Sequence, residues 1–78
     1  MKLENVKILK MGNKLGIWLS KFYFPKGNIV QIKVIKENKE KIFLAKFNRL
    51  ITLRRDIENF LDLKYQDLIT IELDEIKN

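Results

Sequence analysis

Six basic residues stand beside candidate turns and a candidate helix start of this 78-residue chain, and their chemistry is the binding of anions. They are Lys10, Lys14, Lys46, Arg49, Arg54 and Arg55. The first two flank a Gly-Asn pair typical of a turn, the next two flank a candidate turn at Asn48, and the last two precede a helical pattern. A lysine ammonium acts as a point charge on a phosphate, whereas an arginine can also make a bidentate contact with a guanine edge. We therefore expect the lysines to position a duplex and the arginines to contact bases, the alternative for Arg54 and Arg55 being that they only solvate the helix start.

The net charge points in the same direction. Sixteen Lys and Arg oppose ten Asp and Glu, which gives +6 and a pI near 9.7. Residues 1–39 hold nine lysines and two acids, whereas residues 40–78 hold seven basic and eight acidic residues. Segregated positive charge is typical of a surface that binds a polyanion. The alternative is a merely basic surface, because an AT-rich genome also favours lysine, isoleucine and asparagine.

The composition argues against catalysis. The chain has no cysteine and no histidine, which excludes disulfides, thiolate chemistry and ordinary zinc sites. A nucleophile would have to be Ser20, Thr52 or Thr70, and none has a base at a spacing typical of a catalytic pair. No glycine-rich loop that could cradle a phosphate is present. Glu72, Asp74 and Glu75 are carboxylates that could bind a hard cation, but we expect them to be solvated. We therefore expect no enzyme, no cofactor and no metal.

Residues 1–78 are expected to form one small domain with a thin core. A homodimer would be a natural way to enlarge that core. No apolar run approaches the roughly 18 residues of a membrane span, and the first ten residues are charged rather than signal-like. A cytoplasmic protein without a membrane partner is the expectation.

The hydrophobic periodicity predicts a mostly β fold that positions the basic residues. Strands are expected at 6–11, 15–20, 29–35, 42–47, 50–53 and 69–73. One short helix is expected at about 55–62, because Ile57, Phe60 and Leu61 recur at i, i+3 and i+4. Asp56 and Glu58 fall in its first turn, where carboxylates favour a helix start. The polar segment 36–41 is expected to be a hairpin loop or a short connector rather than a flexible domain linker.

The chain contains a degenerate internal repeat, with one copy at about 6–35 and the other at about 42–73. Residues 13–15 match 48–50 at an offset of 35, and the alternating residues that follow match at 34. Further along, 30–34 match 69–73 at 39. Two half-units in one chain predict a pseudo-twofold barrel, which would bring the two turns and their basic residues together at one end.

The offsets also predict how the two copies differ. The first copy has one extra residue near Gly16, which indicates a bulge, and it is five residues shorter where the second copy has its helix. Phe22, Tyr23 and Phe24 are expected to cover the core in place of the missing helix. The alternative is that these aromatic residues, with Trp18, stack on unpaired bases. Trp18 lies on the face opposite Ile17 and is a candidate partner contact.

These segments resemble the motifs of the AbrB/SpoVT-type swapped-hairpin family, which includes the MazE-like antitoxins. There a turn glycine precedes a basic residue and an alternating strand, followed by a proline, a short helix ending in Leu-Gly-apolar, and a final strand. Here residues 48–53 look like the basic residue and strand, 56–61 the helix, 61–63 its apolar ending, and 66–71 the final strand. Residues 12–20 are similar to the glycine-asparagine variant of the antitoxin branch.

The chain departs from the family pattern at several positions. Ser20 and Arg54 occupy the proline positions, Phe47 replaces the turn glycine of the second copy, and Asp62 replaces the glycine after the helix. Trp18 stands where the antitoxin branch often has a basic residue.

The resemblance implies a small swapped-hairpin-type β-barrel that binds double-stranded DNA through basic residues on and near the first strand pair of each unit. The expected function is therefore that of a transcriptional regulator. The alternatives are an antitoxin-like subunit that binds a toxin-type protein partner, and a sequence-neutral nucleoid or single-strand nucleic-acid binder.

Overall fold

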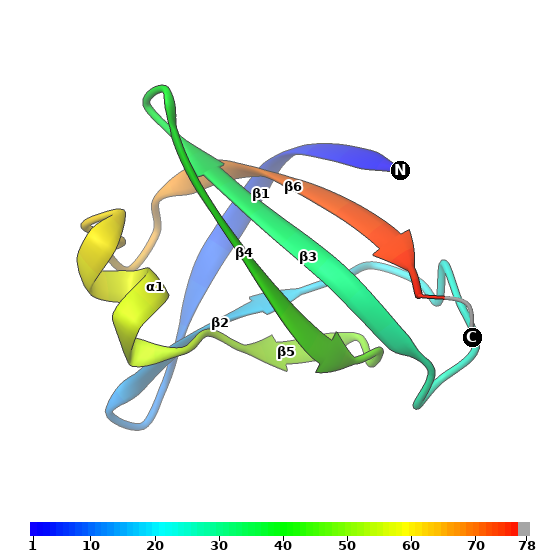
Figure 1. The fold of residues 1–78 in the computed structure, drawn as a ribbon. Coiled ribbons are helices and arrows are strands. Elements are labelled where there is room, and N and C mark those ends of the chain that lie inside the picture. The colour runs from blue at the N-terminus through cyan, green and yellow to red at the C-terminus, as the bar shows by residue number, and fades with distance from the viewer. Residues whose placement is uncertain (77–78) are drawn as a thin grey trace.

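The structure is a computed structural model that describes residues 1–76, and it consists of six strands and one short helix (Figure 1). The elements are β1 (Lys2–Met11), β2 (Lys14–Trp18), β3 (Ile29–Lys36), β4 (Lys39–Lys46), β5 (Leu50–Thr52), α1 (Arg55–Phe60) and β6 (Leu68–Glu75). The predicted mostly β fold with one short helix is confirmed.

The strands form one antiparallel sheet in the order β4-β3-β6-β1-β2-β5, curled into a half-barrel. The inward side chains of alternating positions fill the concave side. The fully buried ones are Ile8, Ile17, Leu19, Val30, Ile32, Val34, Phe47, Leu53, Ile57, Ile71 and Leu73. Burial of one face of each strand explains why the alternating pattern predicted these strands well.

Two tight turns join neighbouring strands, and both use positive φ values. Gly12 has a φ of 61° at the first central position of the β1–β2 turn, where type II′ turns place a glycine. Glu37 and Asn38 have φ values of 50° and 68° between β3 and β4, as a type I′ turn requires. The polar segment predicted as a hairpin loop is therefore a two-residue turn flanked by longer strands.

The sheet follows a pseudo-twofold relation that exchanges β1 with β4, β2 with β5, and β3 with β6. Ile17 lies directly opposite Ile51, its equivalent at the offset of 34. Lys33 lies directly opposite Glu72, its equivalent at the offset of 39. Because equivalent residues face each other in both places, the pseudo-twofold axis passes through the β2–β5 pair and through the β3–β6 pair.

The hydrogen bonds obey the same relation. The N–H of Leu53 donates to the carbonyl of Leu15 at 2.9 Å, and the equivalent N–H of Leu19 donates to the carbonyl of Arg49 at 2.7 Å. A second set surrounds two buried residues, Ile8 and its equivalent Phe47. Ile8 exchanges two backbone bonds with residues 66 and 67, and Phe47 exchanges the same two bonds with residues 27 and 28.

These bonds correct one part of the predicted repeat. Leu15 corresponds to Arg49 rather than to Leu50, because the offset of 34 already applies at that point. The register of both β2 pairs is continuous through Gly16, so the bulge predicted there is wrong. The irregularity lies instead in β1, between Leu3 and Val6, where Asn5 has a φ of 56°.

The two copies differ in two places. Six residues separate Ile8 from Leu15, which is room for the β1–β2 hairpin, whereas only Asn48 separates Phe47 from Arg49. Within residues 1–76, β4 and β5 accordingly do not pair with each other but form the two edges of the sheet, and the barrel stays open between them. In exchange, the second copy has α1, whose Ile57 and the following Leu61 are buried, while residues 19–28 of the first copy form no helix.

Among residues 1–76, no helix has the length and apolar character needed to cross a membrane. The same residues contain no group of three or more potential metal-ligating side chains.

Candidate nucleic-acid interface

The two basic turns lie at opposite ends of the β2–β5 pair, so the predicted convergence at one end is wrong. Lys14 begins β2, whereas Arg49 lies beside Leu19, just after the end of that strand. The physical reason is that a twofold axis perpendicular to an antiparallel pair sends equivalent residues in opposite directions along it. Figure 1 shows the β1–β2 turn beside α1 and the β4–β5 connection on the far side of the molecule.

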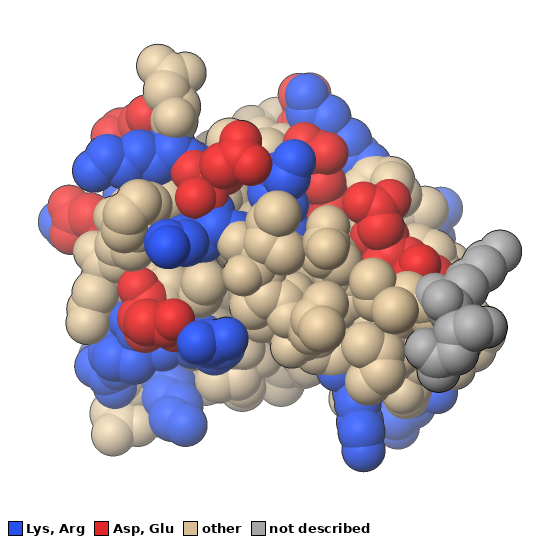
Figure 2. Space-filling view, in the orientation of Figure 1, with Lys and Arg blue, Asp and Glu red and all other residues tan. Residues whose placement is uncertain are grey.

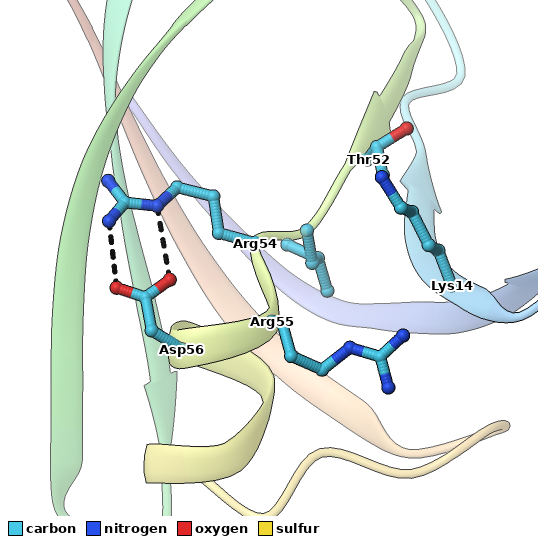
Figure 3. A pocket seen from close by; sticks show the side chains of 6 residues that line it. Lys14, Thr52, Arg54, Arg55 and Asp56 are labelled. Carbon is cyan, nitrogen blue, oxygen red and sulfur yellow. Dashed lines mark hydrogen bonds and ion pairs between the residues drawn. The ribbon is translucent and has the colours of Figure 1, made fainter.

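The first of these places, here called the hairpin end, comprises residues 10–14 and 52–56. An open pocket of about 500 Å³ lies there. It is lined by Lys14, Thr52, Leu53, Arg54, Arg55 and Asp56 (Figure 3). Within the part of the chain that the structure describes, the lining joins the β1–β2 hairpin, which the second copy lacks, to α1, which the first copy lacks. The structure thus brings together three of the six predicted basic residues.

The two arginines of the pocket have different partners. Arg54 donates two hydrogen bonds to Asp56, at 3.1 and 2.8 Å, and both side chains are 61% exposed. Arg55 points the other way and donates from Nη2 to the carbonyl of Asn13 at 3.1 Å, which ties the helix to the hairpin turn (Figure 3). Arg55 and the exposed Lys14 therefore have no carboxylate partner within the described residues, and their charge is available to an anion.

Lys10 lies in the same hairpin, opposite Leu15, and its side chain is exposed. It adds a fourth positive charge to the hairpin end.

The opposite place, here called the aromatic end, comprises residues 19–24 and 47–49. Phe47 is fully buried, and the rings of Phe22 and Phe24 contact its ring edge-on, with 6.1 and 5.5 Å between the ring centroids. This contact supports the interpretation that the aromatic residues cover the core where the first copy lacks a helix. At the aromatic end, rings cover the core around Phe47, and a second open pocket of about 350 Å³ lies beside them, lined by residues 2–7 and by Trp18, Leu19, Ser20 and Tyr23.

Arg49 is part of that aromatic packing. Its guanidinium lies 4.7 Å from the ring centre of Phe22, and its Nε is buried without a hydrogen-bond partner among the described residues. A cation–π contact of this kind restrains the side chain. Lys46 is exposed at the end of β4, next to Phe47. These two predicted residues are therefore separated from the other four.

Acidic residues are unevenly placed relative to the twofold axis. The segments 5–36 and 41–55 contain no Asp or Glu, and they include β2 and β5 at one end of the axis and β3 at the other. At that other end, β6 carries Glu72, Asp74 and Glu75, and its partner β3 carries Lys33 and Lys36. Figure 2 shows basic side chains at the lower left and lower right of the view, an acidic group beside those at the lower left, and mixed charges in the upper part. The strands β2 and β5 thus carry no acid, whereas β6 carries three.

The two segments without acids are a sequence signal that the prediction from basic residues beside turns did not use. They add lysines of the strands and loops near the two ends to the candidate surface, namely Lys7, Lys21 and Lys26. They also contain Trp18, which is 52% exposed and faces Leu50 across the β2–β5 pair.

One ion pair outside this surface holds the loop after α1. The Nζ of Lys36 donates to Asp67 at 2.8 Å and to the carbonyl of Asp62 at 2.6 Å, and the carboxylate of Asp67 also accepts the N–H of Lys64. The hydrogen bond from Lys36 holds the pKa of Asp67 below its ordinary value, and the same bond raises the pKa of Lys36. Residues 28 and 75, the equivalents of 67 and 36, are joined by a bond from Asn28 to Glu75.

Comparisons of this chain with protein-family models, with curated proteins and with solved structures find no match. Its function is therefore argued from its own residues.

Proposed function

We propose that this chain is a cytoplasmic DNA-binding protein that contacts duplex DNA through the outward face of β2 and β5 and the basic residues at both ends of that strand pair. The observation that carries the proposal is that β2 and β5 contain no Asp or Glu and have basic residues at both ends of the pair, whereas β6, at the other end of the pseudo-twofold axis, carries three acids. Positive charge collected on one face attracts a polyanion and releases the counterions condensed on it.

The spacing of the two basic groups suits a duplex. Arg49 lies beside Leu19, which follows Lys14 by five residues, just after the end of β2. At about 3.3 Å per residue, the backbones of Lys14 and Arg49 are therefore about 17 Å apart. A major groove is about 12 Å wide and admits a two-stranded β-ribbon. Long side chains from the two ends could reach the phosphates on both sides of such a groove, with β2 and β5 between them.

The hairpin end supplies the stronger contacts in this proposal. Lys14 and Arg55 are exposed, and neither has a carboxylate partner within the described residues. A threonine hydroxyl, Thr52, lines the same pocket. At the aromatic end, Lys46 and the surrounding lysines position the backbone, and Arg49 has a restrained role because it lies on Phe22.

A role as a transcriptional regulator is the form of this proposal that agrees with the resemblance to the AbrB/SpoVT-type family. The exchange symmetry of the six strands supports that resemblance, because swapped hairpins from two units generate such a topology. The single-strand alternative has less support, since the rings of Phe22 and Phe24 pack on Phe47, although Phe22 and Trp18 are both about half exposed.

The test is a salt titration of duplex binding by fluorescence anisotropy. With about six phosphates contacted, the logarithm of the binding constant should fall with a slope of roughly five against the logarithm of salt concentration. The double variant Lys14→Gln, Arg55→Gln removes two contacts and should lower that slope by about two. The matched control is Lys33→Gln, which removes one charge at the acidic end of the axis and should leave the slope unchanged.

No duplex binding at low salt, or equal effects of the double variant and the control, would refute the proposal. Competition with random duplex then separates a regulator from a nucleoid protein, because a specific site should win by about a thousandfold or more.

A further inference from the structure

The pseudo-twofold axis emerges between β2 and β5, where four positions face outward. They form two cross-strand pairs, Gly16 with Thr52 and Trp18 with Leu50. Under the offset of 34, Trp18 is the equivalent of Thr52, and Gly16 is the equivalent of Leu50. The backbone at these positions is thus symmetric, and any difference between the two halves comes from the side chains.

The side chains break the symmetry completely. The half next to the hairpin end presents a hydroxyl on Thr52, and the side chain of Met11 lies over the buried Gly16, where a Cβ would otherwise be. The half next to the aromatic end presents Trp18 and Leu50, which are 52% and 39% exposed. One half thus combines a hydroxyl with the Met11 side chain, and the other has two large apolar side chains and no hydroxyl.

The charges around the two halves differ in the same way. Positions 54 and 55 are arginines at the hairpin end, and their equivalents at the aromatic end are Ser20 and Lys21. Lys14 lines the basic pocket, whereas Arg49 at the other end is restrained on Phe22. A ligand that lies across the axis therefore meets a different set of donors on each side.

We propose that the chain recognises a non-palindromic duplex sequence, bound by a single chain in one orientation. This inference rests on the proposed function. A dimer of identical chains binds a palindrome, because the symmetry of the site mirrors that of the protein. Here both half-units belong to one chain, and their outward residues are different, so the two halves of the site must differ in sequence as well.

The chemistry assigns a type of base contact to each half. At the hairpin end, Arg55 has the fork that suits a guanine edge, and Thr52 offers a hydroxyl and a methyl group. At the aromatic end, Trp18 and Leu50 offer apolar surface that suits a thymine methyl group and no hydrogen-bond readout. Reversing one half of the preferred sequence should therefore weaken binding about ten- to a hundredfold.

The absence of cysteine from the sequence allows a direct test of orientation. The preferred duplex is first selected from a random pool with the unmodified protein. Asn13→Cys, at the hairpin end, and Asn48→Cys, at the aromatic end, are then each labelled with an iron chelate that cleaves nearby DNA. The stoichiometry is measured in the same buffer by sedimentation of the complex.

The expected result is a selected sequence without twofold symmetry, one chain per duplex, and cleavage at opposite ends of the site by the two labels. A palindromic selection, two chains per site, or cleavage at both ends by each label would overturn the inference while leaving duplex binding in place. Enrichment of no sequence would overturn it too, and a failure of the unmodified protein to bind any duplex would overturn the proposed function itself.

Two exposed-residue variants provide a second measurement that does not depend on the labels. Thr52→Val should change base preference only in the half of the site cut by the Asn13 label. Trp18→Thr, which makes the two outward halves more alike, should reduce the preference for one orientation. A change of preference in the opposite half for either variant would contradict the assignment of residues to half-sites.

Discussion

The hairpin end and the aromatic end of the β2–β5 pair are equivalent in backbone and opposite in character. Equivalent hydrogen bonds close both ends, from Leu53 to Leu15 and from Leu19 to Arg49. Yet the pocket at one end is lined by basic side chains, whereas the other end is packed with the rings around Phe47, and the pocket beside them is lined by Trp18, Tyr23 and residues 2–7. The main-chain register therefore carries the repeat, whereas the local insertions and deletions decide which side chains line each end.

The largest expected effect tests the packing at the aromatic end. Phe47→Ala removes a fully buried ring with two edge-on neighbours and should lower the free energy of unfolding by about 3–5 kcal/mol. The equivalent Ile8→Ala should cost about 2–5 kcal/mol, because Ile8 is equally buried. Urea unfolding followed by circular dichroism measures both. A loss below 1 kcal/mol for Phe47→Ala would mean that the rings do not support the core.

The next effect concerns the close approach that Gly16 allows. Gly16→Ala places a Cβ against Sδ of Met11 and 3.0 Å from the carbonyl oxygen of Ile51, and it should cost about 1–3 kcal/mol. Thermal unfolding of Gly16→Ala and of Gly16→Ala, Met11→Ala measures it. The second substitution removes the nearer obstacle and should restore part of the loss. If Met11→Ala lowers the stability of the Gly16→Ala variant by as much as it lowers that of the unmodified protein, the contact with Met11 is not the cause of the loss.

The ion pair of Lys36 and Asp67 should contribute a smaller, pH-dependent stability. Asp67→Asn keeps an acceptor for the N–H of Lys64 and loses the charge, so it should cost about 1 kcal/mol at neutral pH. The pKa of Asp67 is lowered in the folded state, so its contribution is present above its ordinary value of 3.8 and is lost as the pH falls through the lower folded value. Unfolding curves of the two proteins should therefore differ at pH 7 and converge near pH 2. A difference that persists at pH 2 would exclude this cause.

The smallest effect is expected at the equivalent position of the first copy. Asn28→Ala removes an exposed bond to Glu75 and should cost less than about 1 kcal/mol. Its dependence on pH should be weaker than that of Asp67→Asn, because the residue removed carries no charge. Equal losses for the two variants would show that the charge of Asp67 adds nothing.

The elements of the fold were largely predictable from the sequence, because burial of one face imposes a period of two. The start of β1 was not, since residues 2–5 do not alternate clearly and are held by pairing with β6. Phe47 in place of a glycine is a sequence sign that β4 and β5 form no tight hairpin. Only the hydrogen bonds of Phe47 with residues 27 and 28 show where the segment after β4 lies instead.

The candidate site was predictable in its members rather than in its arrangement. Charge and spacing singled out Lys14 and Arg55, which share one pocket. They also singled out Arg49, but no local pattern reveals that Phe22, far away in sequence, covers its guanidinium. The direction of an equivalent strand across a twofold axis likewise depends on pairing, and the sequence offset alone does not contain it.

The place of β6 in the sheet has a consequence for the order of folding. Within residues 1–76, β6 is the last strand in sequence and lies between β3 and β1, so it joins a unit of β3 and β4 to a unit of β1, β2 and β5. During synthesis these two units have no strand pairing with each other until β6 is complete. Contacts between residues so distant in sequence slow folding, and we expect the sheet to assemble only after the whole strand has left the ribosome.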